Sequence, residues 1–162
     1  LSKEAAIERL ENFWDPYHSK LAELLDRARQ QFGYSILIDT HSMPHEAILN
    51  ASSSFRTSQI VLGDRYGATC APEIINDLIK LISKNGLRAS RNIPFSGAYI
   101  VQKYGSPGLN RHAIQLEIDR SIYMDERKIQ KLEKFHKLKN KLQNIMRDFS
   151  QIHTCLNSIA AE

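Results

Sequence analysis

The sequence predicts an α/β fold, and three observations support this class. Patterns typical of helices alternate with patterns typical of strands along the chain. The largely apolar run YSILID, residues 34–39, is what we expect of a strand covered on both faces. The chain has 162 residues, of which 42% are hydrophobic, so it can bury one core. We therefore expect one domain, or part of a larger one.

The first part of the chain predicts two helices followed by a strand. Residues 5–14, AAIERLENFW, have the apolar spacing of a short amphipathic helix. Asp15 is expected to cap a second helix, which carries Pro16 in its first turn and stops at Gly33. The apolar face of this second helix consists of Tyr17, Leu21, Leu24, Leu25 and Ala28. YSILID follows as the first strand.

The rest of the chain predicts further strands and helices. SQIVLGD, residues 58–64, is expected to be the second strand, and a helix begins at Pro72 and ends at KNG, residues 84–86. GAYIVQKYG, residues 97–105, and HAIQLEIDR, residues 112–120, are the third and fourth strands. From about Met124 a long helix is expected, because apolar residues recur in helical steps: Leu138, Leu142, Ile145, Phe149, Ile152, Leu156 and Ile159.

The positive charge of the chain is concentrated in one segment. The net charge is +4, and residues 127–147 contain eight Lys or Arg and one acid, Glu133. A basic helix with a solvated face explains this pattern better than nucleic-acid binding. The sequence also has no basic strand interleaved with aromatic residues of the kind that stacks on bases. We therefore do not expect a nucleic-acid partner.

Cysteine usage and hydropathy bear on the compartment. Cys70 and Cys155 lie far apart and show neither CxxC nor CxxH spacing, so they indicate neither a disulfide framework nor a cysteine zinc site. No apolar run approaches the roughly 18–20 residues that cross a bilayer, and no signal peptide opens the chain. We expect a reduced, cytoplasmic protein with no membrane partner.

Several well-known motifs are absent. HEAIL, residues 45–49, begins like the HExxH motif of zinc proteases, but Leu49 stands where the second histidine is required. The sequence contains no P-loop, no GxGxxG and no GxSxG. His45 and Glu46 are therefore interpreted as loop surface rather than as ligands.

Two acid-bearing strand ends form the candidate site. Asp39 and His41 close the first strand, and Glu117 lies in the fourth, so both ends can meet in one crevice. Asp39 and His41 are two residues apart and face the same side of a strand, where the carboxylate can orient a zinc-ligating histidine. An ordinary polar loop is the more common explanation of such a pair at the end of a strand. Glu117 lies within an apolar strand, and either catalysis or a salt bridge with an arginine would explain it.

Five segments together resemble the N-formylglutamate amidohydrolase family, specifically its C-terminal portion. They are PYHSKLAELL, LIDTHSMP, IVLGDRYGATC, NIPFSGAYIVQKYG and HAIQLEIDRSIYMDE, in order from Tyr17 to Glu126. The resemblance implies a three-layer α/β/α sandwich with a mixed sheet, like that of the zinc exopeptidases and aspartoacylase, incomplete at its N-terminus. Residues 1–126 would then be part of this domain, and residues 127–162 a long basic helix packing on it.

The resemblance also implies a reaction and roles for individual residues. One zinc ion would hydrolyse N-formyl-L-glutamate, or a similar N-acyl amino acid, to formate and glutamate. His41 resembles a zinc ligand, Asp39 its orienting partner and Glu117 the general base. Arg65 and Arg120 suit the carboxylates of the substrate, since a guanidinium binds a carboxylate through two hydrogen bonds. Pairing with Asp64 or Asp119 would explain these two arginines equally well.

Other residues have plainer interpretations. His112 is interpreted as a buried structural histidine rather than a proton partner in the site. Tyr17 and His18 match a family motif, although helix packing explains Tyr17 equally well. Cys70 is interpreted as a small buried residue rather than a nucleophile.

The chain departs from the family pattern in ways that leave a second hypothesis open. A PHSG-type segment that resembles the source of further zinc ligands, and an Asn-Arg pair that resembles substrate-binding residues, do not occur in it. Ala98 stands where a second glycine is common, and Lys103 where a histidine is common. The alternative is a non-catalytic remnant or interaction module that keeps the fold and lacks a complete zinc site.

The same departures predict uncovered apolar surface. Without further N-terminal strands the sheet would expose apolar side chains, which favours self-association through the sheet or the C-terminal helix. The chain alone is expected to bind zinc weakly or not at all.

Overall fold

A computed structural model describes residues 2–51, 55 and 57–159, with side chains as far as residue 152. Its main sheet has the strand order β1 (Ser35–Met43), β4 (Arg111–Asp119), β2 (Ile60–Gly63) and β3 (Ala89–Arg91). β1 is parallel to β4, β2 is antiparallel to β4, and β3 is parallel to β2. The predicted α/β class and mixed sheet are confirmed, while β3 is a strand that the sequence did not predict.

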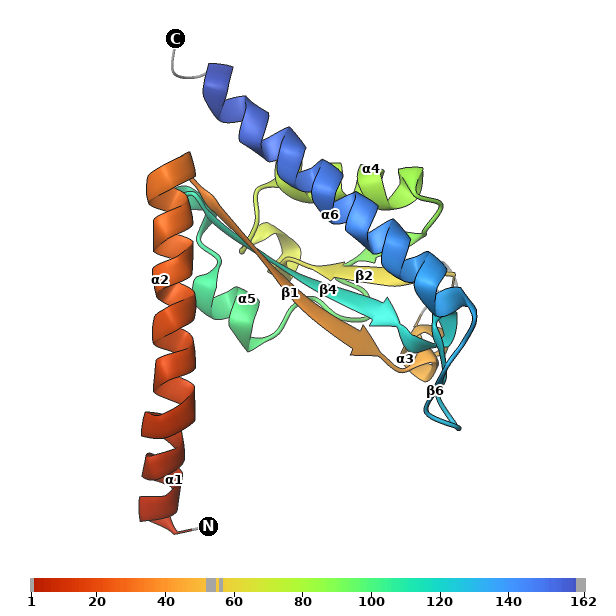
Figure 1. Ribbon diagram of the computed structural model, residues 1–162, viewed down its shortest axis with the longest axis horizontal. Helices are drawn as coiled ribbons and strands as arrows, with labels where there is room; N and C mark the ends of the chain where they lie inside the picture. Colours follow the sequence, from red (N-terminus) through yellow and green to blue (C-terminus); the bar gives the residue numbers. More distant parts are fainter. Residues whose placement is uncertain (1, 52–54, 56, 160–162) are drawn as a thin grey trace.

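The main core lies on one face of this sheet, beneath α4 (Pro72–Lys84) and α6 (Lys134–Ile159) (Figure 1). It includes Leu62, Ile75, Leu78, Ile82, Ile114, Leu116, Ile118 and Ile145, all buried. The other face carries two short helices, α3 (His45–Leu49) and α5 (Tyr99–Tyr104), and a smaller cluster of Met43, Ile48 and Val61. Because these helices are short, the full three-layer sandwich stays a prediction.

The N-terminal helices form one rod that projects past the sheet (Figure 1). It consists of α1 (Lys3–Arg9), the π-helical turn η1 (Leu10–Trp14) and α2 (Asp15–Phe32). The predicted break at Asp15 is wrong, because Trp14 and Asp15 both have right-handed helical dihedral angles. We call the part of the rod before Asp15 the arm.

Part of the predicted apolar face of α2 is also wrong. Tyr17 and Leu24 are exposed, with 56% and 48% of their surface accessible, whereas His18 and Leu25 are buried. The helix packs against β1, contacts α5 through His18 and pairs with β4 through Asp26 and Arg111. Its apolar spacing therefore does not predict which of its residues are buried.

The predicted strand over residues 97–105 is instead α5. Gly97 has a φ of +106° and turns the chain just before the helix, a conformation that suits glycine. Lys103 Nζ then reaches Tyr99 Oη across one helical turn, at 3.2 Å. A short apolar run does not distinguish a strand from a buried helix, which is why the pattern misled.

The C-terminal helix begins later than predicted. A short 3₁₀ turn, η5 (Arg120–Ile122), and a hairpin of β5 (Met124–Asp125) and β6 (Gln130–Lys131) precede α6. The Asp125 carboxylate accepts the backbone N–H groups of the two residues that follow Glu126, which closes the turn of the hairpin. Leu138, Ile145 and Phe149 are buried as predicted, while the side chains of Leu156 and Ile159 lie outside the described residues.

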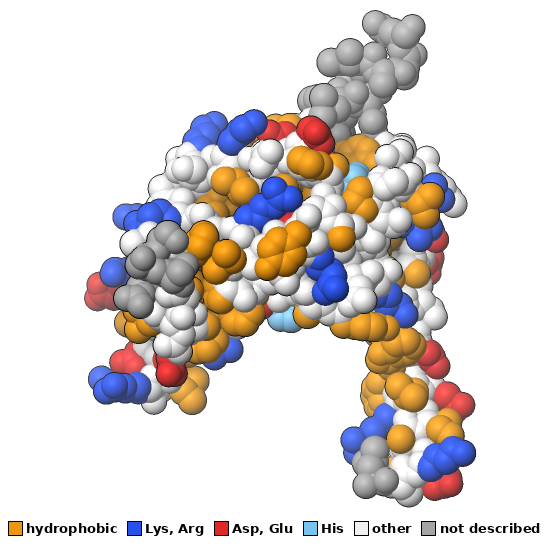
Figure 2. Space-filling view, turned by 180° about the vertical axis from the view of Figure 1, so that it is seen from behind, with side chains coloured by type: hydrophobic (Ala, Val, Ile, Leu, Met, Phe, Trp, Pro, Cys, Tyr) orange, Lys and Arg blue, Asp and Glu red, His pale blue; other side chains and the backbone are white. Residues whose placement is uncertain are grey.

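Apolar surface is accessible on the arm and beside the edge of the sheet. The arm exposes Ile7, Leu10, Phe13 and Trp14, and Figure 2 shows hydrophobic side chains running along this projection. Beside the edge strand β1, a groove of about 290 Å³ is lined by Ile36 and Ile38 of β1 together with residues of α2 and α6. Ile36 and Ile38 are half-buried against the core, so the uncovered apolar sheet surface that the sequence predicts stays a prediction.

In the described part of the chain, none of the helices combines the length and the apolar character that a membrane crossing requires. The cytoplasmic location and the division of the chain at residue 126 stay predictions.

Candidate active site

Polar side chains gather on the face of the sheet opposite the main core. Residues in register on neighbouring strands point to the same face, as do residues two apart on one strand. Asp39 is in register with Gln115, and His41 with Glu117. On β2, Val61 of the smaller apolar cluster is in register with Glu117, which assigns all four polar residues to the face that carries α3 and α5. The register therefore brings His41 and Glu117 together, as predicted.

His41 and Asp39 form a close pair. β1 continues to Met43, so both residues lie inside the strand rather than at its end. His41 Nε2 lies 3.1 Å from Asp39 Oδ1, and the His41 side chain is 47% exposed. A carboxylate at this distance favours the ring proton on Nε2, and in that tautomer the lone pair lies on Nδ1. The other oxygen, Asp39 Oδ2, is buried and has no hydrogen-bond partner among the described residues.

Glu117 is a buried carboxylate with one oxygen held and one without a partner. Gln115 Nε2 donates to Glu117 Oε1 at 2.6 Å, while Glu117 Oε2 accepts no hydrogen bond from the described residues. The ion pairs of the described residues do not include Glu117, so the salt bridge considered as an alternative is not observed. Such an orphaned oxygen in a native fold calls for an explanation, and a functional role is one.

Arg65 lies in η3 (Arg65–Gly67), a 3₁₀ turn directly after β2. Its φ is +51°, a strained left-handed conformation for a residue with a side chain. Asp64 is fully buried and binds Arg91 through two hydrogen bonds, so it is not the partner of Arg65. Arg65 Nη1 instead donates to Gly97 O at 3.3 Å, which leaves the guanidinium without a carboxylate partner among the described residues.

Arg120 binds the end of β1. Its Nε donates to Ser42 Oγ at 3.2 Å and its Nη2 to Ser42 O at 3.3 Å. Pairing with Asp119 is not observed either. The Ser42 side chain points to the face opposite His41, because neighbouring residues of a strand alternate. The structure therefore does not bring Arg120 to the polar face.

His45 was interpreted as loop surface, and the structure corrects this. It begins α3, and its Nδ1 lies 2.8 Å from Asp119 Oδ2 and 3.1 Å from Ser121 Oγ. Its backbone N–H donates to Glu126 Oε2 at 3.1 Å. Both side-chain partners contact the same ring nitrogen, so this group ties α3 to the end of β4.

The remaining predicted residues make contacts with other groups than His41, Asp39 and Glu117. His112 is buried and accepts the backbone N–H of Ala71 at 3.3 Å, in keeping with a structural role. Burial, followed by the influence of Asp64, raises the pKa of the Cys70 thiol to about 12, so this thiol is a poor nucleophile. His18 lies 2.6 Å from Tyr104 Oη through its Nδ1, and burial together with the charge of Lys103 lowers its pKa.

Gln115 and the pair of His45 with Asp119 are the contacts that the sequence did not reveal. Gln115 precedes Glu117 by two residues, so strand periodicity alone would have placed both on one face. For His45 and Asp119 no such local signal exists, because 74 residues separate them.

The described residues fit only part of a metal site. Among them, no group of three His, Cys, Asp or Glu side chains is arranged to hold a metal ion. His41 with Asp39 has the form of one ligand and its orienting carboxylate, whereas a catalytic zinc usually has three protein ligands.

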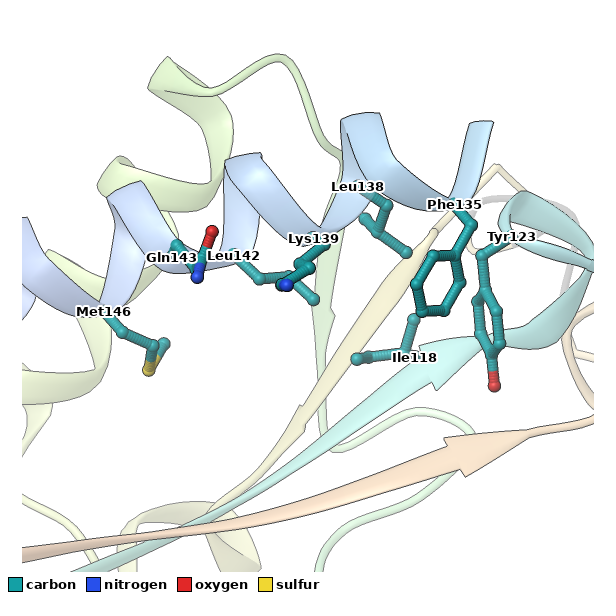
Figure 3. A pocket seen from close by; sticks show the side chains of 8 residues that line it. All are labelled: Ile118, Tyr123, Phe135, Leu138, Lys139, Leu142, Gln143 and Met146. Carbon is teal, nitrogen blue, oxygen red and sulfur yellow. The ribbon is translucent and has the colours of Figure 1, made fainter. Parts of the chain in front are cut away.

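An apolar groove lies apart from this site. A groove of about 490 Å³ lies between α6 and the end of β4, where Phe135 and Leu138 lie over Ile118 (Figure 3). It is on the face opposite His41 and Glu117, and its one charged lining residue is Lys139. Its lining is mostly apolar and includes neither a carboxylate nor a histidine.

Comparison with known proteins identifies relatives. A family model described as N-formylglutamate amidohydrolase matches residues 1–124. The chain is 37% identical over 130 residues to N-formylglutamate deformylase of Pseudomonas putida, and 35% identical over 130 residues to that of Pseudomonas aeruginosa. Each match includes 77% of this chain but 46% and 47% of the relative, so the chain spans about half the length of these curated relatives.

Solved structures agree with this result. The crystal structure of N-formylglutamate amidohydrolase from Ralstonia eutropha aligns with a TM-score of 0.83 at 30% identity, over 93% of this chain and 55% of that one. A gene product of Agrobacterium tumefaciens aligns with a TM-score of 0.60 at 15% identity, over 94% and 55% of the two chains, which shows a shared fold alone.

Proposed function

Because this chain belongs to the N-formylglutamate amidohydrolase family, we propose that its protein hydrolyses the N-formyl amide of N-formyl-L-glutamate, or of a similar N-acyl amino acid. The products would be formate and glutamate. The names of the two Pseudomonas relatives support this substrate class. The observation that carries the proposal is the unpartnered oxygen of buried Glu117 on the same face as the pair of His41 and Asp39.

Glu117 would act as the general base and acid. Amide hydrolysis requires that water lose a proton and that the departing amine gain one, and a single carboxylate can carry both transfers. Oε2 is the oxygen suited to this work, since Oε1 is engaged by Gln115. Burial keeps competing water away from the carboxylate.

Zinc is the cofactor that we propose for the complete enzyme, with His41 as one ligand and Asp39 as its orienting partner. A bound zinc polarises the carbonyl and makes its water more acidic. The described residues do not complete such a site, so further ligands would have to come from other residues.

Arg65 is the better placed of the two predicted substrate-binding residues. Its guanidinium has no carboxylate partner among the described residues, and it contacts the same loop, residues 96–98, that contacts Gln115. It can therefore bind a substrate carboxylate near Glu117. Arg120 would need to leave Ser42 to do the same.

A non-catalytic interaction module is the second candidate function. The observation that favours it is the lack of a three-ligand group in the described part of the chain. The exposed apolar side chains of the arm would then belong to a binding surface. Self-association through the sheet edge or α6 also stays a prediction, which light scattering of the purified chain would test.

Formate release and zinc content separate the two candidates. The assay compares the 162-residue chain with the complete gene product, including whatever residues flank the chain. We expect weak zinc binding and no turnover from the chain alone, and about one zinc with formate release from the complete product. A complete product without zinc or turnover would favour the interaction module.

Two variants of the complete product test the residue roles. His41→Ala should lose zinc and activity together, whereas the exposed His136→Ala should lose neither. Glu117→Gln should keep zinc and lose turnover, because an amide does not accept the proton from water. Glu133→Gln is its exposed control. An active Glu117→Gln variant would disprove the role of Glu117.

A further inference from the structure

The amide of Gln115 is fixed at both of its ends. Gln115 is buried on β4, with 4% of its surface exposed. The backbone N–H of Ala98 donates to Gln115 Oε1 at 2.6 Å, and Gln115 Nε2 donates to Glu117 Oε1 at 2.6 Å. A backbone N–H can only donate, so this contact determines which end of the amide is oxygen and turns the NH₂ group toward Glu117.

The loop that supplies this N–H is itself held against the sheet. Gly63 on β2 is in register with Gln115, and a Cβ atom added to Gly63 would lie 2.5 Å from Gly97 N and 2.6 Å from Ser96 C. The loop backbone therefore occupies the space of a side chain at position 63. Arg65 N also donates to Ser96 O at 2.7 Å. The loop thus contacts both Arg65 and Gln115.

The result is a chain of contacts that ends at Glu117. Packing at Gly63 positions the loop, Ala98 N–H orients Gln115, and the Gln115 amide holds one oxygen of Glu117. The other oxygen is left without a partner among the described residues. The residue that departs from the family pattern, Ala98, contributes its backbone N–H, so the change from glycine does not remove the donor.

We propose that Gln115 is a positioning residue that determines which oxygen of Glu117 exchanges protons and where that oxygen points. Transfer of a proton requires an oxygen held within hydrogen-bond reach and in a fixed direction. Without the amide, the Glu117 carboxylate is free to rotate about its terminal torsion, which is a soft one. This inference rests on the proposed function, because it assigns Gln115 a role in that same reaction.

The contact network can be tested in the 162-residue chain without any activity. Hydrogen exchange of the Ala98 amide, followed by NMR, should be slow in the unaltered chain. Gln115→Leu should speed it by about tenfold or more, because the acceptor is lost. Gln115→Glu should leave it slow, since a carboxylate oxygen replaces Oε1. Gln30→Leu, at an exposed position on α2, is the control. An unchanged rate in Gln115→Leu would overturn the network.

The role in the reaction is tested in the complete gene product. Gln115→Leu and Gln115→Glu should both lower kcat by about 10- to 100-fold, with KM within twofold and zinc content unchanged. Gln115→Leu removes the donor to Glu117 and also frees the loop. Gln115→Glu keeps the acceptor for Ala98 and places a second carboxyl beside Glu117, so the two acids share a proton and Glu117 is a weaker base. A kcat equal to that of the unaltered enzyme in either variant would overturn the proposal.

A double variant separates positioning from general damage. In a Glu117→Asp background the shortened carboxylate no longer reaches Nε2, so adding Gln115→Leu should lower kcat by less than twofold further. A full additional 10- to 100-fold loss would mean structural damage and would overturn the proposal. If the unaltered complete product shows no turnover, the proposed function is wrong, and so is the role of Gln115 in it. Slow hydrogen exchange of the Ala98 amide would still support the contacts of Gln115 in that case.

Discussion

The two faces of the central sheet are built for different purposes. On one face, Ile114, Leu116 and Ile118 of β4 are buried beneath α4 and α6 in a continuous apolar core. On the other, Gln115 and Glu117 of the same strand are also buried, yet Glu117 keeps an oxygen without a partner. Along β4, residues that stabilise the fold therefore alternate with residues that form a polar site and lower the stability.

This difference predicts that mutations on the core face affect mainly folding stability, whereas mutations on the polar face affect mainly function. Side chains on the core face contribute mainly through removal of apolar surface from water. The other face has a smaller apolar cluster of Met43, Ile48 and Val61, and its polar side chains include an unsatisfied oxygen, Glu117 Oε2, which costs free energy. Functional sites commonly lower stability in this way.

The largest effect on stability should come from the core face. Leu116→Ala removes a side chain that is 2% exposed, and it should lower the free energy of unfolding by about 2–5 kcal/mol. Urea denaturation followed by circular dichroism measures this change. If Leu116→Ala lowered the free energy of unfolding no more than a substitution at an exposed position, the proposed difference between the two faces would be wrong.

Cys70, which belongs to the same core, should be almost inert to alkylation. Its pKa is raised from 9.0 to about 12, which lowers the thiolate fraction at pH 8 by about a thousandfold. Iodoacetamide labelling of the Cys70 peptide, measured by mass spectrometry, should be slow in the folded chain and fast in urea. Because the unfolded thiol ionises first, stability should also fall as the pH rises above about 9. Rapid labelling of folded chain would contradict this prediction.

On the polar face, a neighbouring residue of the same strand should behave in the opposite way. Glu117→Gln keeps an acceptor for Gln115 and removes a buried charge, so the chain should be unchanged or more stable by up to about 1 kcal/mol. The same urea denaturation measures this change in the free energy of unfolding. A loss as large as that of Leu116→Ala would show that Glu117 supports the fold, and the contrast between the faces would disappear.

The smallest effect is expected on the arm. Phe13 is 74% exposed, so Phe13→Ser should change the free energy of unfolding by no more than about 0.5 kcal/mol. Thermal denaturation at two protein concentrations checks this. A larger loss that grows with concentration would show that the arm is buried in an assembly.

Sequence reasoning succeeded where the pattern is long or local. The apolar run of β4 and the helix that begins at Pro72 were both placed correctly, since their periodicity extends over many residues. The pairing of Asp39 with His41 also follows from a spacing of two on one strand. Residues 97–105 were assigned wrongly, because nine residues of mixed character do not separate a strand from a short helix.

The sequence by itself determined the α/β class, the family resemblance and the side of β4 on which Glu117 lies, because alternation along a strand is a local property of the chain. Only the tertiary structure decided how Glu117 is held. Ala98 meets Gln115 because Gly63 lets the loop backbone approach the sheet, and His45 meets Asp119 across 74 residues. Packing between distant segments determines these contacts, and it produces no periodic pattern in the sequence.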